Sequence, residues 1–431
     1  MHIFEIPCHI HSLINLIKAQ YYTPKRIKVD QEKKLQRVIK RVYEHVPYYK
    51  KLFDKNFIVF NSIKTLDDLK IIPITTRSDI QQLEKKEVVA DDVGPGCCYN
   101  YKTGGSTGTP LNIYISNLEM RRRHIAAEFM YFSNGFGLVD RTLRIFEKKY
   151  DKPRNLLNKL GLMDRRFFVL DAPSSEVVST MRCWKPNLLI SYPSKILELA
   201  KVVSSQDIAY SGLKGIFTSG EVMTQRERGI IEKVFGAEVY DYYSANECGM
   251  IGWECNKHSG LHINTTDLIV EVVDCNGNPT AGEGRVIVTT LSAYAMPFVR
   301  YDLGDIGKLS QQNCTCGRTA PLIEGILGRA LEFIKIPDEL VNPWHFTNAI
   351  ETYPGISKYQ IIQDSDKHLE IKIVKNEKFN PDIAKGVINA CSTLVKNKLS
   401  VNIKIVSDLP EGNEDKYITV KSVCDRKIGN Y

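Results

Sequence analysis

The sequence has 431 residues, of which 43% are hydrophobic and 25% charged, and its net charge is +8. This length predicts two or three domains, and the modest, dispersed charge argues against a nucleic-acid-binding protein. No run reaches the roughly 18 apolar residues that a membrane-spanning helix needs, so no membrane span is predicted. The 11 cysteines, in a chain without a basic leader, indicate reduced thiols and a cytoplasmic location.

The first predicted elements are helical. An amphipathic stripe within residues 3–17 is interrupted by Pro7, and we expect it to pack on its own domain, with a membrane surface or a partner as the alternative. Apolar residues then repeat at helical spacing over 33–46, and Pro47 ends this predicted helix. The basic cluster at 121–123 lies in helix-like sequence and is expected to form a solvated face.

Glycine, serine and threonine are concentrated in residues 101–110, Tyr-Lys-Thr-Gly-Gly-Ser-Thr-Gly-Thr-Pro. Glycines allow close approach to the backbone, and consecutive N–H groups in such a loop form a concavity that attracts an anion. The segment is not a Walker A loop, because no Gly-Lys-Ser/Thr follows the glycines at the required spacing. It therefore predicts a phosphate-binding loop, with a flexible surface turn as the alternative.

Residues 180–243 alternate short apolar runs with helical pattern, which predicts βαβ units and a mainly parallel sheet. The predicted strands are 187–191, 215–217 and 237–243, and the predicted helices are 194–203 and 227–234. Ligands of such sheets bind beyond the carboxyl ends of the strands, so one site can collect residues 219–221 and 246–247. The predicted fold class is α/β.

The pattern changes after residue 268. Two predicted strands, 268–273 and 284–290, flank Asp274-Cys275-Asn276-Gly277-Asn278, which is a β-hairpin signature. After Gly328 the pattern is typical of a small α+β unit, with strands at 358–363, 368–374 and 401–406 and a helix at 381–398. We therefore predict a large domain over 1–328, which includes the β-hairpin subdomain, and a small domain over 329–431.

A set of cysteines and histidines has the composition of a structural zinc site. The set is Cys255, His258, Cys314 and Cys316. A C-x2-H pair and a C-x-C pair supply four ligands, enough for tetrahedral Zn²⁺. His262 is an equal alternative to His258, and Cys248 is a spare thiol. The other interpretation is a group of free cysteines without a metal.

Six motifs occur in order along the chain. They are Pro73-Ile74-Thr75-Thr76-Arg77-Ser78-Asp79-Ile80, the loop at 101–110, Thr218-Ser219-Gly220-Glu221, Tyr243-Ser244-Ala245-Asn246-Glu247, Arg300-Tyr301-Asp302-Leu303-Gly304-Asp305, and Gly328-Arg329 with Phe333-Ile334-Lys335. Together they resemble the adenylate-forming superfamily, and within it the phenylacetate-CoA ligase family with its capsule-biosynthesis-associated branch. The resemblance covers the chain from about Lys33 to its end.

The resemblance implies an enzyme that uses ATP and Mg²⁺ to convert a small carboxylic acid into an acyl-adenylate, releases pyrophosphate, and passes the acyl group to CoA. The implied phosphate-binding residues are Thr103, Gly104, Gly105, Ser106, Thr107 and Gly108. The implied nucleotide and metal residues are Glu247 for Mg²⁺, Gly220, Glu221 and Tyr243 for adenine, Asp305 for the ribose hydroxyls, and Arg329 for the ribose or a phosphate. Lys416, in the C-terminal domain that the resemblance implies is a mobile lid, is the implied catalytic lysine. Glu247 and Thr107 of the large domain are the other implied catalytic residues.

Some positions depart from the family pattern. The departures are Ser244 and Asp415, where the family has glycine, and Asp338-Glu339, where it has a glycine loop. Lys421 and Lys427 are alternatives to the catalytic lysine. Because the glycine loop is the part that meets the thiol, the acidic pair leaves the acceptor open: CoA, a carrier thiol, or an amine or hydroxyl in surface-polysaccharide biosynthesis.

Two further classes of protein remain as alternatives, and the oligomeric state is also undecided. A non-catalytic nucleotide-binding homologue would keep the fold without the reaction, although Lys416, Glu247 and Asp305 argue against it. A zinc-dependent nucleic-acid binder would show salt-dependent binding, and only the Cys/His set favours it. The sequence does not decide between a monomer and a homodimer.

Overall fold

The computed structural model describes most of the chain. The described residues are 6–94, 96–103, 111–146, 158, 161–162, 164–205, 212–274, 276–329, 333–337, 339–341, 345–346, 349–350, 352–409 and 420–422. Contacts divide the chain into two compact units. The first holds the chain up to Gly325 except for two short segments, Asp274–Asn276 and Gly304–Gly307, which join the second unit with Ile326–Tyr431. This division lies close to the boundary predicted at residue 328.

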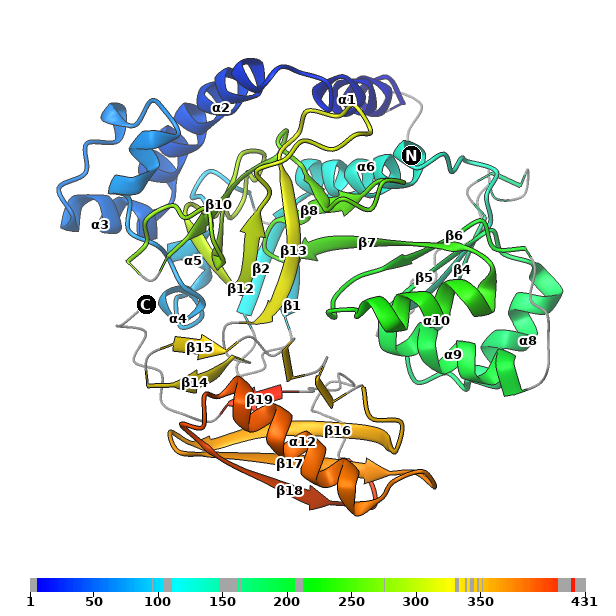
Figure 1. Cartoon of the computed structure of the whole chain (residues 1–431). Helices are drawn as coiled ribbons and strands as arrows, with labels where there is room; N and C mark the ends of the chain where they lie inside the picture. Colours follow the sequence, from blue (N-terminus) through cyan, green and yellow to red (C-terminus); the bar gives the residue numbers. More distant parts are fainter. Residues whose placement is uncertain are drawn as a thin grey trace. The chain divides into compact units, whose positions relative to one another are not determined.

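A large mixed sheet organises the first unit (Figure 1). Within the described residues it has 11 strands in the order β10-β11-β12-β13-β9-β8-β7-β6-β5-β3-β4. Their bounds are β3 (Thr142–Phe146), β4 (Arg165–Val169), β5 (Leu188–Ser191), β6 (Gly215–Thr218), β7 (Glu238–Ala245), β8 (Gly249–Glu254), β9 (Leu261–Ile263), β10 (Leu268–Val273), β11 (Gly284–Thr290), β12 (Tyr301–Leu309) and β13 (Leu322–Arg329).

Strand β7 is where the sheet changes direction. Strands β3 to β7 pair in parallel, and the last parallel pair joins Thr218 of β6 to Asp241 of β7. The second half of β7 pairs antiparallel with β8, which places Tyr243 opposite Gly252. Strands β10 and β11 form the predicted antiparallel hairpin. The predicted α/β class and its βαβ units are confirmed.

Helices cover both faces of the parallel part. One face packs against α8 (Ser174–Trp184), α9 (Pro193–Ser205) and α10 (Gln225–Phe235) in one buried cluster. The opposite face packs against α6 (Asn117–Ser133), where Phe129 meets Trp253 edge-on at 5.4 Å. Helix α10 begins with a Thr224–Glu227 capping box and ends at Gly236 in the left-handed conformation.

The N-terminal helices are α1 (Ile6–Ala19), α2 (Pro24–His45) and α3 (Pro47–Lys55), followed by the short turns η2 (Phe60–Ser62), η3 (Asp67–Ile71), α4 (Arg77–Ile80) and α5 (Lys85–Val88). Pro7 lies in the first turn of α1, where its missing N–H costs no hydrogen bond, and residues 3–5 of the predicted stripe lie outside the described residues. Pro47 likewise starts α3 directly after α2 has ended. Leu16 is buried in the core beside α6, as expected, while Ile14 and Ile17 are exposed.

The second unit is a small α+β structure. Its four-stranded sheet has the order β18-β17-β16-β19, with β16 (Ile356–Ser365), β17 (His368–Lys375), β18 (Ser400–Ile405) and β19 (Val420–Ser422). Helix α12 (Pro381–Leu394) packs on this sheet, and its C-terminus comes earlier than the predicted residue 398. A separate hairpin joins β14 (Ile334–Ile336) to β15 (Glu339–Val341). In the described part of the chain, no helix has the length and apolarity needed to cross a bilayer.

Candidate functional site

Two predicted site segments follow neighbouring strands of the sheet. Residues 219–221 come directly after β6, and the turn 246–248 joins β7 to β8. Because β6 and β7 are parallel neighbours, their carboxyl ends lie at the same edge. The structure therefore brings the two segments to one edge of the sheet, as the alternating sequence pattern predicted.

The segment after β6 contains a glycine that geometry requires. Gly220 has φ +81°, and a Cβ atom there would lie 2.6 Å from the ring of Tyr192. Any larger residue would clash with that ring, which is itself buried and packs edge-on against Phe146 at 5.5 Å. Tyr192 is thus a packing residue that shapes this edge of the sheet.

Glu221 has a structural partner in the first turn of α9. Its Oε2 accepts from the backbone N–H of Ser194 at 2.9 Å, and its Oε1 accepts from the Ser194 hydroxyl at 2.8 Å. A carboxylate at a helix N-terminus is favourable, since the first N–H groups there have no partner within the helix. The resemblance suggested an adenine contact for Glu221, and the structure adds this capping role.

The turn between β7 and β8 carries Glu247, the predicted Mg²⁺ ligand. Cys248 closes the turn with its N–H donated to the Ala245 carbonyl at 3.2 Å. Tyr301, the buried first residue of β12, lies close enough to Glu247 to be affected by its charge: burial raises the pKa of Tyr301 most, and the Glu247 carboxylate raises it further. Tyr243, on the same strand as the turn, is half-buried.

A carboxylate pair lies further back on β7 and β8. Asp241 accepts a hydrogen bond from the Thr218 hydroxyl at 3.2 Å, and its N–H donates to Glu254 at 2.8 Å. Arg228 of α10 binds both oxygens of Glu254, at 3.0 and 2.9 Å. Burial, and then the charge of Glu254, raise the pKa of Asp241 to about 7, while Arg228 opposes the shift. Sequence reasoning missed this pair, because neither carboxylate belongs to a recognisable motif.

Two paired strands precede and follow the predicted phosphate loop in the sequence. Strand β1 (Cys98–Thr103) pairs antiparallel with β2 (Leu111–Ser116), and Thr103 is opposite Leu111. Residues 104–110, and with them Gly104, Gly105, Ser106, Thr107 and Gly108, lie outside the described residues.

The remaining predicted nucleotide and catalytic residues belong to the second unit. Asp305 is half-buried within β12, and Arg329 is the last residue of β13, although its side chain is outside the described part. Lys416 and Asp338 are also outside it. Glu339 is the first residue of β15 and pairs with Ile336 of β14.

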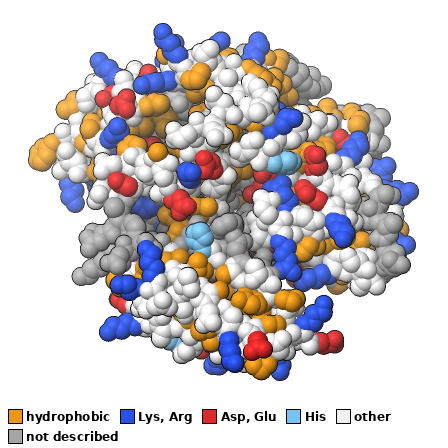
Figure 2. Space-filling model, viewed as in Figure 1, with side chains coloured by type: hydrophobic (Ala, Val, Ile, Leu, Met, Phe, Trp, Pro, Cys, Tyr) orange, Lys and Arg blue, Asp and Glu red, His pale blue; other side chains and the backbone are white. Residues whose placement is uncertain are grey.

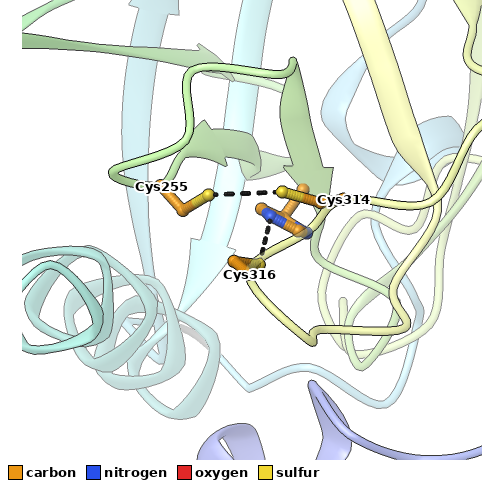
Figure 3. Close-up of side chains that lie close together, drawn as sticks. Cys255, Cys314 and Cys316 are labelled. Atoms are coloured by element: carbon orange, nitrogen blue, oxygen red, sulfur yellow. Dashed lines mark hydrogen bonds between the residues drawn. The ribbon is translucent and has the colours of Figure 1, made fainter.

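Three cysteines and one histidine come together in the first unit. They are Cys255, His262, Cys314 and Cys316, whose ligand atoms all lie within 4.8 Å of one another. Figure 3 shows the Cys255 and Cys314 side chains pointing toward each other, with 3.6 Å between their sulfur atoms. The Cys316 sulfur lies 3.4 Å from Nε2 of His262. Such a set of soft and imidazole ligands suits a tetrahedral Zn²⁺.

Strand pairing decides which histidine joins this cluster. His262 is in β9, opposite Trp253 of β8 and Leu322 of β13, and it is fully buried. His258 instead points its Nδ1 to Glu254 at 3.2 Å and lies outside the cluster. The sequence did not distinguish His258 from His262, because spacing alone cannot show which of them faces the cysteines. Cys248, the spare thiol, is also outside the cluster.

Burial and neighbouring groups shift the pKa values of the cluster in different directions, and the shifts of His262 and Cys316 are those that favour metal binding. Burial, and then nearby Arg318, lower the pKa of His262 to about 4, which keeps the imidazole neutral and able to ligate. Burial raises the pKa of the Cys255 thiol to about 12. Burial also opposes ionisation of Cys316, but N–H donation from Arg318 and contacts with the neighbouring thiols outweigh it and lower its pKa.

Charges on the visible surface are mixed. In Figure 2 the Lys and Arg side chains are scattered and interspersed with Asp and Glu. This distribution differs from the continuous basic patch of a nucleic-acid-binding face.

The expectation that the basic cluster at 121–123 forms a solvated face is wrong for Arg123. Its side chain is only 15% exposed and pairs with Glu119, whereas that of Arg122 is 44% exposed. One face of α6 is buried at this point, so the two neighbouring arginines have different environments.

Comparisons with known proteins identify relatives over most of the chain. Residues 334–423 match the family model of the CapK C-terminal domain. The phenylacetate-coenzyme A ligase of Thermus thermophilus is 25% identical over 390 residues, covering 84% of this chain and 85% of its own. The Escherichia coli phenylacetate-coenzyme A ligase is 24% identical over 370 residues, covering 80% and 81% respectively.

Solved structures share the fold. A 2-hydroxyisobutyryl-CoA ligase in the postadenylation state, in complex with R3-HIB-AMP, has a TM-score of 0.79 at 19% identity and covers 96% of this chain and 92% of its own. An open conformation of that ligase, in complex with 2-HIB-AMP and CoA, gives 0.66 at 20% identity and covers 92% and 91%. An anthranilate CoA ligase in complex with anthranoyl-AMP gives 0.58 at 15% identity, covering 74% and 64%.

Proposed function

We propose that this chain, a homologue of the phenylacetate-CoA ligases with the fold of adenylate-forming CoA ligases, activates a carboxylic acid with ATP and transfers its acyl group to CoA. One structural observation carries the proposal. The Gly220-Glu221 segment and the Glu247 turn, two motifs of that family, lie at one edge of the sheet beyond β6 and β7. The order of motifs and the relatives' names then specify the reaction.

The reaction has two steps. A carboxylate oxygen of the acid attacks the α-phosphorus of ATP, the bond to the pyrophosphate oxygen breaks, and an acyl-adenylate forms. The CoA thiolate then attacks the acyl carbon, and AMP leaves. Charge develops on phosphoryl oxygens in the first step, so positioned cations and N–H donors contribute more than a general base.

The proposed roles follow the resemblance. The loop 104–108 with Thr103 holds the phosphates, Gly220 and Tyr243 line the adenine pocket, and Glu247 holds Mg²⁺ together with phosphate oxygens. When bound, Mg²⁺ would neutralise part of the negative charge of the phosphates. Asp305 accepts from the ribose hydroxyls, since a carboxylate offers two acceptor oxygens to a vicinal diol.

The resemblance implies two further roles. Arg329 contacts the ribose or a phosphate, and the ammonium group of Lys416 stabilises the charge that develops between the carboxylate and the α-phosphate.

The cysteine and histidine cluster serves a separate purpose. Cys255, His262, Cys314 and Cys316 would hold a structural Zn²⁺, because four protein ligands leave no open position for a substrate. The metal would join β8, β9 and the segment between β12 and β13. Thiolate ligands need reduced cysteines, which fits the cytoplasmic location predicted from the cysteine content.

Pyrophosphate release tests the function. The wild-type chain with Mg-ATP is offered aryl, acyl and amino acids, with and without CoA, and acyl-CoA is measured in parallel. Release with one class of acid, and acyl-CoA formed only with CoA present, would support the proposal. Release without acyl-CoA would move the acceptor to a carrier thiol, an amine or a hydroxyl. No release with any acid, despite ATP binding, would favour a non-catalytic homologue.

A further inference from the structure

Helix α6 carries a buried acidic residue in its first turn. Ser116 caps this helix by accepting from the backbone N–H of Glu119 at 3.2 Å. The Glu119 side chain is only 5% exposed. A buried carboxylate is costly unless it is paired, so its partner shows why it is there.

The partner is Arg123, one helical turn later. Its Nη2 and Nε donate to the same oxygen of Glu119, at 2.6 and 3.2 Å. Burial raises the pKa of Glu119, and the Arg123 charge opposes that shift. The guanidinium group is therefore held in one orientation by the residue that precedes it on the same helix face.

The free edge of this guanidinium group reaches the turn between β7 and β8. Nη1 donates to the carbonyl oxygen of Asn246 at 2.6 Å, and Nη2 donates to that of Glu247 at 2.9 Å. The aliphatic stem of Arg123 lies over Gly249, where a Cβ would come within 3.0 Å of Cγ, and Gly249 has φ +77°. Helix α6 thus fixes two consecutive carbonyls and the glycine that begins β8.

The same helix follows the hairpin that carries the predicted phosphate loop. Strand β2 ends at Ser116, which is the N-cap of α6. A short path of covalent bonds and hydrogen bonds therefore runs from the Thr103–Leu111 pair to the Glu247 turn. Sequence reasoning missed this link, because the contacts join residues more than 120 positions apart.

We propose that Arg123, oriented by Glu119, is a positioning residue that sets the placement of Glu247 relative to the phosphate-loop hairpin. The inference rests on the proposed function, in which Glu247 holds Mg²⁺. A buried ion pair contributes little net stability compared with apolar residues of similar volume, so its main effect here is geometric. A carboxylate that is displaced by about 1 Å can cost about a hundredfold in rate.

The test compares Arg123→Lys with Arg122→Lys, a matched change at the adjacent, exposed arginine. Pyrophosphate release is measured over a range of Mg²⁺ and acid concentrations, and the thermal shift caused by Mg-ATP is measured separately. For Arg123→Lys we expect the half-maximal Mg²⁺ concentration to rise about tenfold and kcat to fall about ten- to a hundredfold, with KM for the acid unchanged. Arg122→Lys should match the wild type.

Glu119→Gln provides a second variant if Arg123→Lys folds poorly. It keeps the volume and removes the charge that orients Arg123, so the Mg²⁺ requirement should rise severalfold. A folded Arg123→Lys with wild-type Mg²⁺ dependence would overturn the inference. A lower melting temperature in both Arg123→Lys and Glu119→Gln, without any change in Mg²⁺ dependence, would also overturn the inference, because the Glu119–Arg123 pair would then have only a structural role. A wild-type chain that shows neither pyrophosphate release nor a Mg-ATP thermal shift would instead overturn the proposed function itself.

Discussion

Glu221 and Ser194 are joined by two hydrogen bonds, with both oxygens of the carboxylate used at the start of α9. The residue after Gly220 is thereby tied to the helix that leads away from β5. Because the carboxylate is occupied, Gly220 and the backbone after it are the parts of this motif best placed to meet a nucleotide.

Removal of this cap should affect stability more than catalysis. Glu221→Ala should lower the free energy of unfolding by about 1 kcal/mol, as the loss of a helix cap does, with a modest rise in KM for ATP. Urea unfolding and ATP kinetics check this. Ser194→Ala should cause a smaller stability loss, and the double variant should be less than additive. A Glu221→Ala variant with unchanged stability and a hundredfold loss of ATP affinity would mean that the carboxylate binds the nucleotide instead.

Lys416→Ala should reduce pyrophosphate release about a hundred- to a thousandfold, which is typical when a positioned donor to the developing charge is lost. Binding of ATP should persist, because the lysine acts on the reacting group. Lys421→Ala and Lys427→Ala serve as matched controls and should keep most activity. If one of them abolished release while Lys416→Ala did not, the catalytic lysine would be reassigned.

The metal cluster makes a prediction about composition. The purified chain should contain about one zinc per molecule, and Cys316→Ser should lose the metal and about 3 kcal/mol of stability, because metal binding free energy is part of the folding free energy. Cys183→Ser, an exposed cysteine outside the cluster, should keep both. His262→Asn should behave like Cys316→Ser, and His258→Asn should retain zinc. Equal metal content in all four variants would contradict the site.

Asp241 should impose a pH dependence on stability. Its pKa is about 7 in the folded protein and 3.8 as an ordinary carboxyl, so between these values the folded state binds more protons than the unfolded state. The free energy of unfolding should therefore fall as the pH rises from 4 to 7.

Asp241→Asn should remove that loss. The asparagine keeps an acceptor oxygen for Thr218. The free energy of unfolding of the variant should equal that of the wild type near pH 4 and exceed it by about 1 to 2 kcal/mol above pH 7. One pKa unit corresponds to about 1.4 kcal/mol, and partial solvent access weakens the effect. Asp67→Asn, at an exposed position, is the control. A variant whose unfolding curve parallels the wild type at every pH would show that Asp241 is ionised throughout.

Periodicity was enough to predict three strands of the parallel part of the sheet, although it did not predict β3 and β4. The apolar runs that became β5, β6 and β7, and the helical patterns that became α9 and α10, are local signals that tertiary packing reinforced. The prediction that Pro47 ends the preceding helix is confirmed, since α2 ends at His45, and Pro47 then occupies the first turn of α3, where proline is tolerated.

The site residues that sequence could not assign depend on distant contacts. His262 rather than His258 faces the cysteines because β9 pairs with both β8 and β13, which spacing in the sequence does not show. Arg123 was expected to be solvated, but its partners come from a turn far along the chain. The roles of the loop 104–108, Asp305, Arg329 and Lys416, and of the acidic pair Asp338-Glu339, stay predictions.

The change of direction within β7 has a consequence for unfolding. Its first half is hydrogen-bonded to β6 and its second half to β8, so a single strand holds the parallel and antiparallel regions in one sheet. Neither region can detach unless this strand opens, and we expect its amide protons to exchange with solvent only through the highest-energy opening of the unit. A nucleotide that binds at the 246–248 turn and makes it more rigid should therefore slow amide exchange in both β6 and β8.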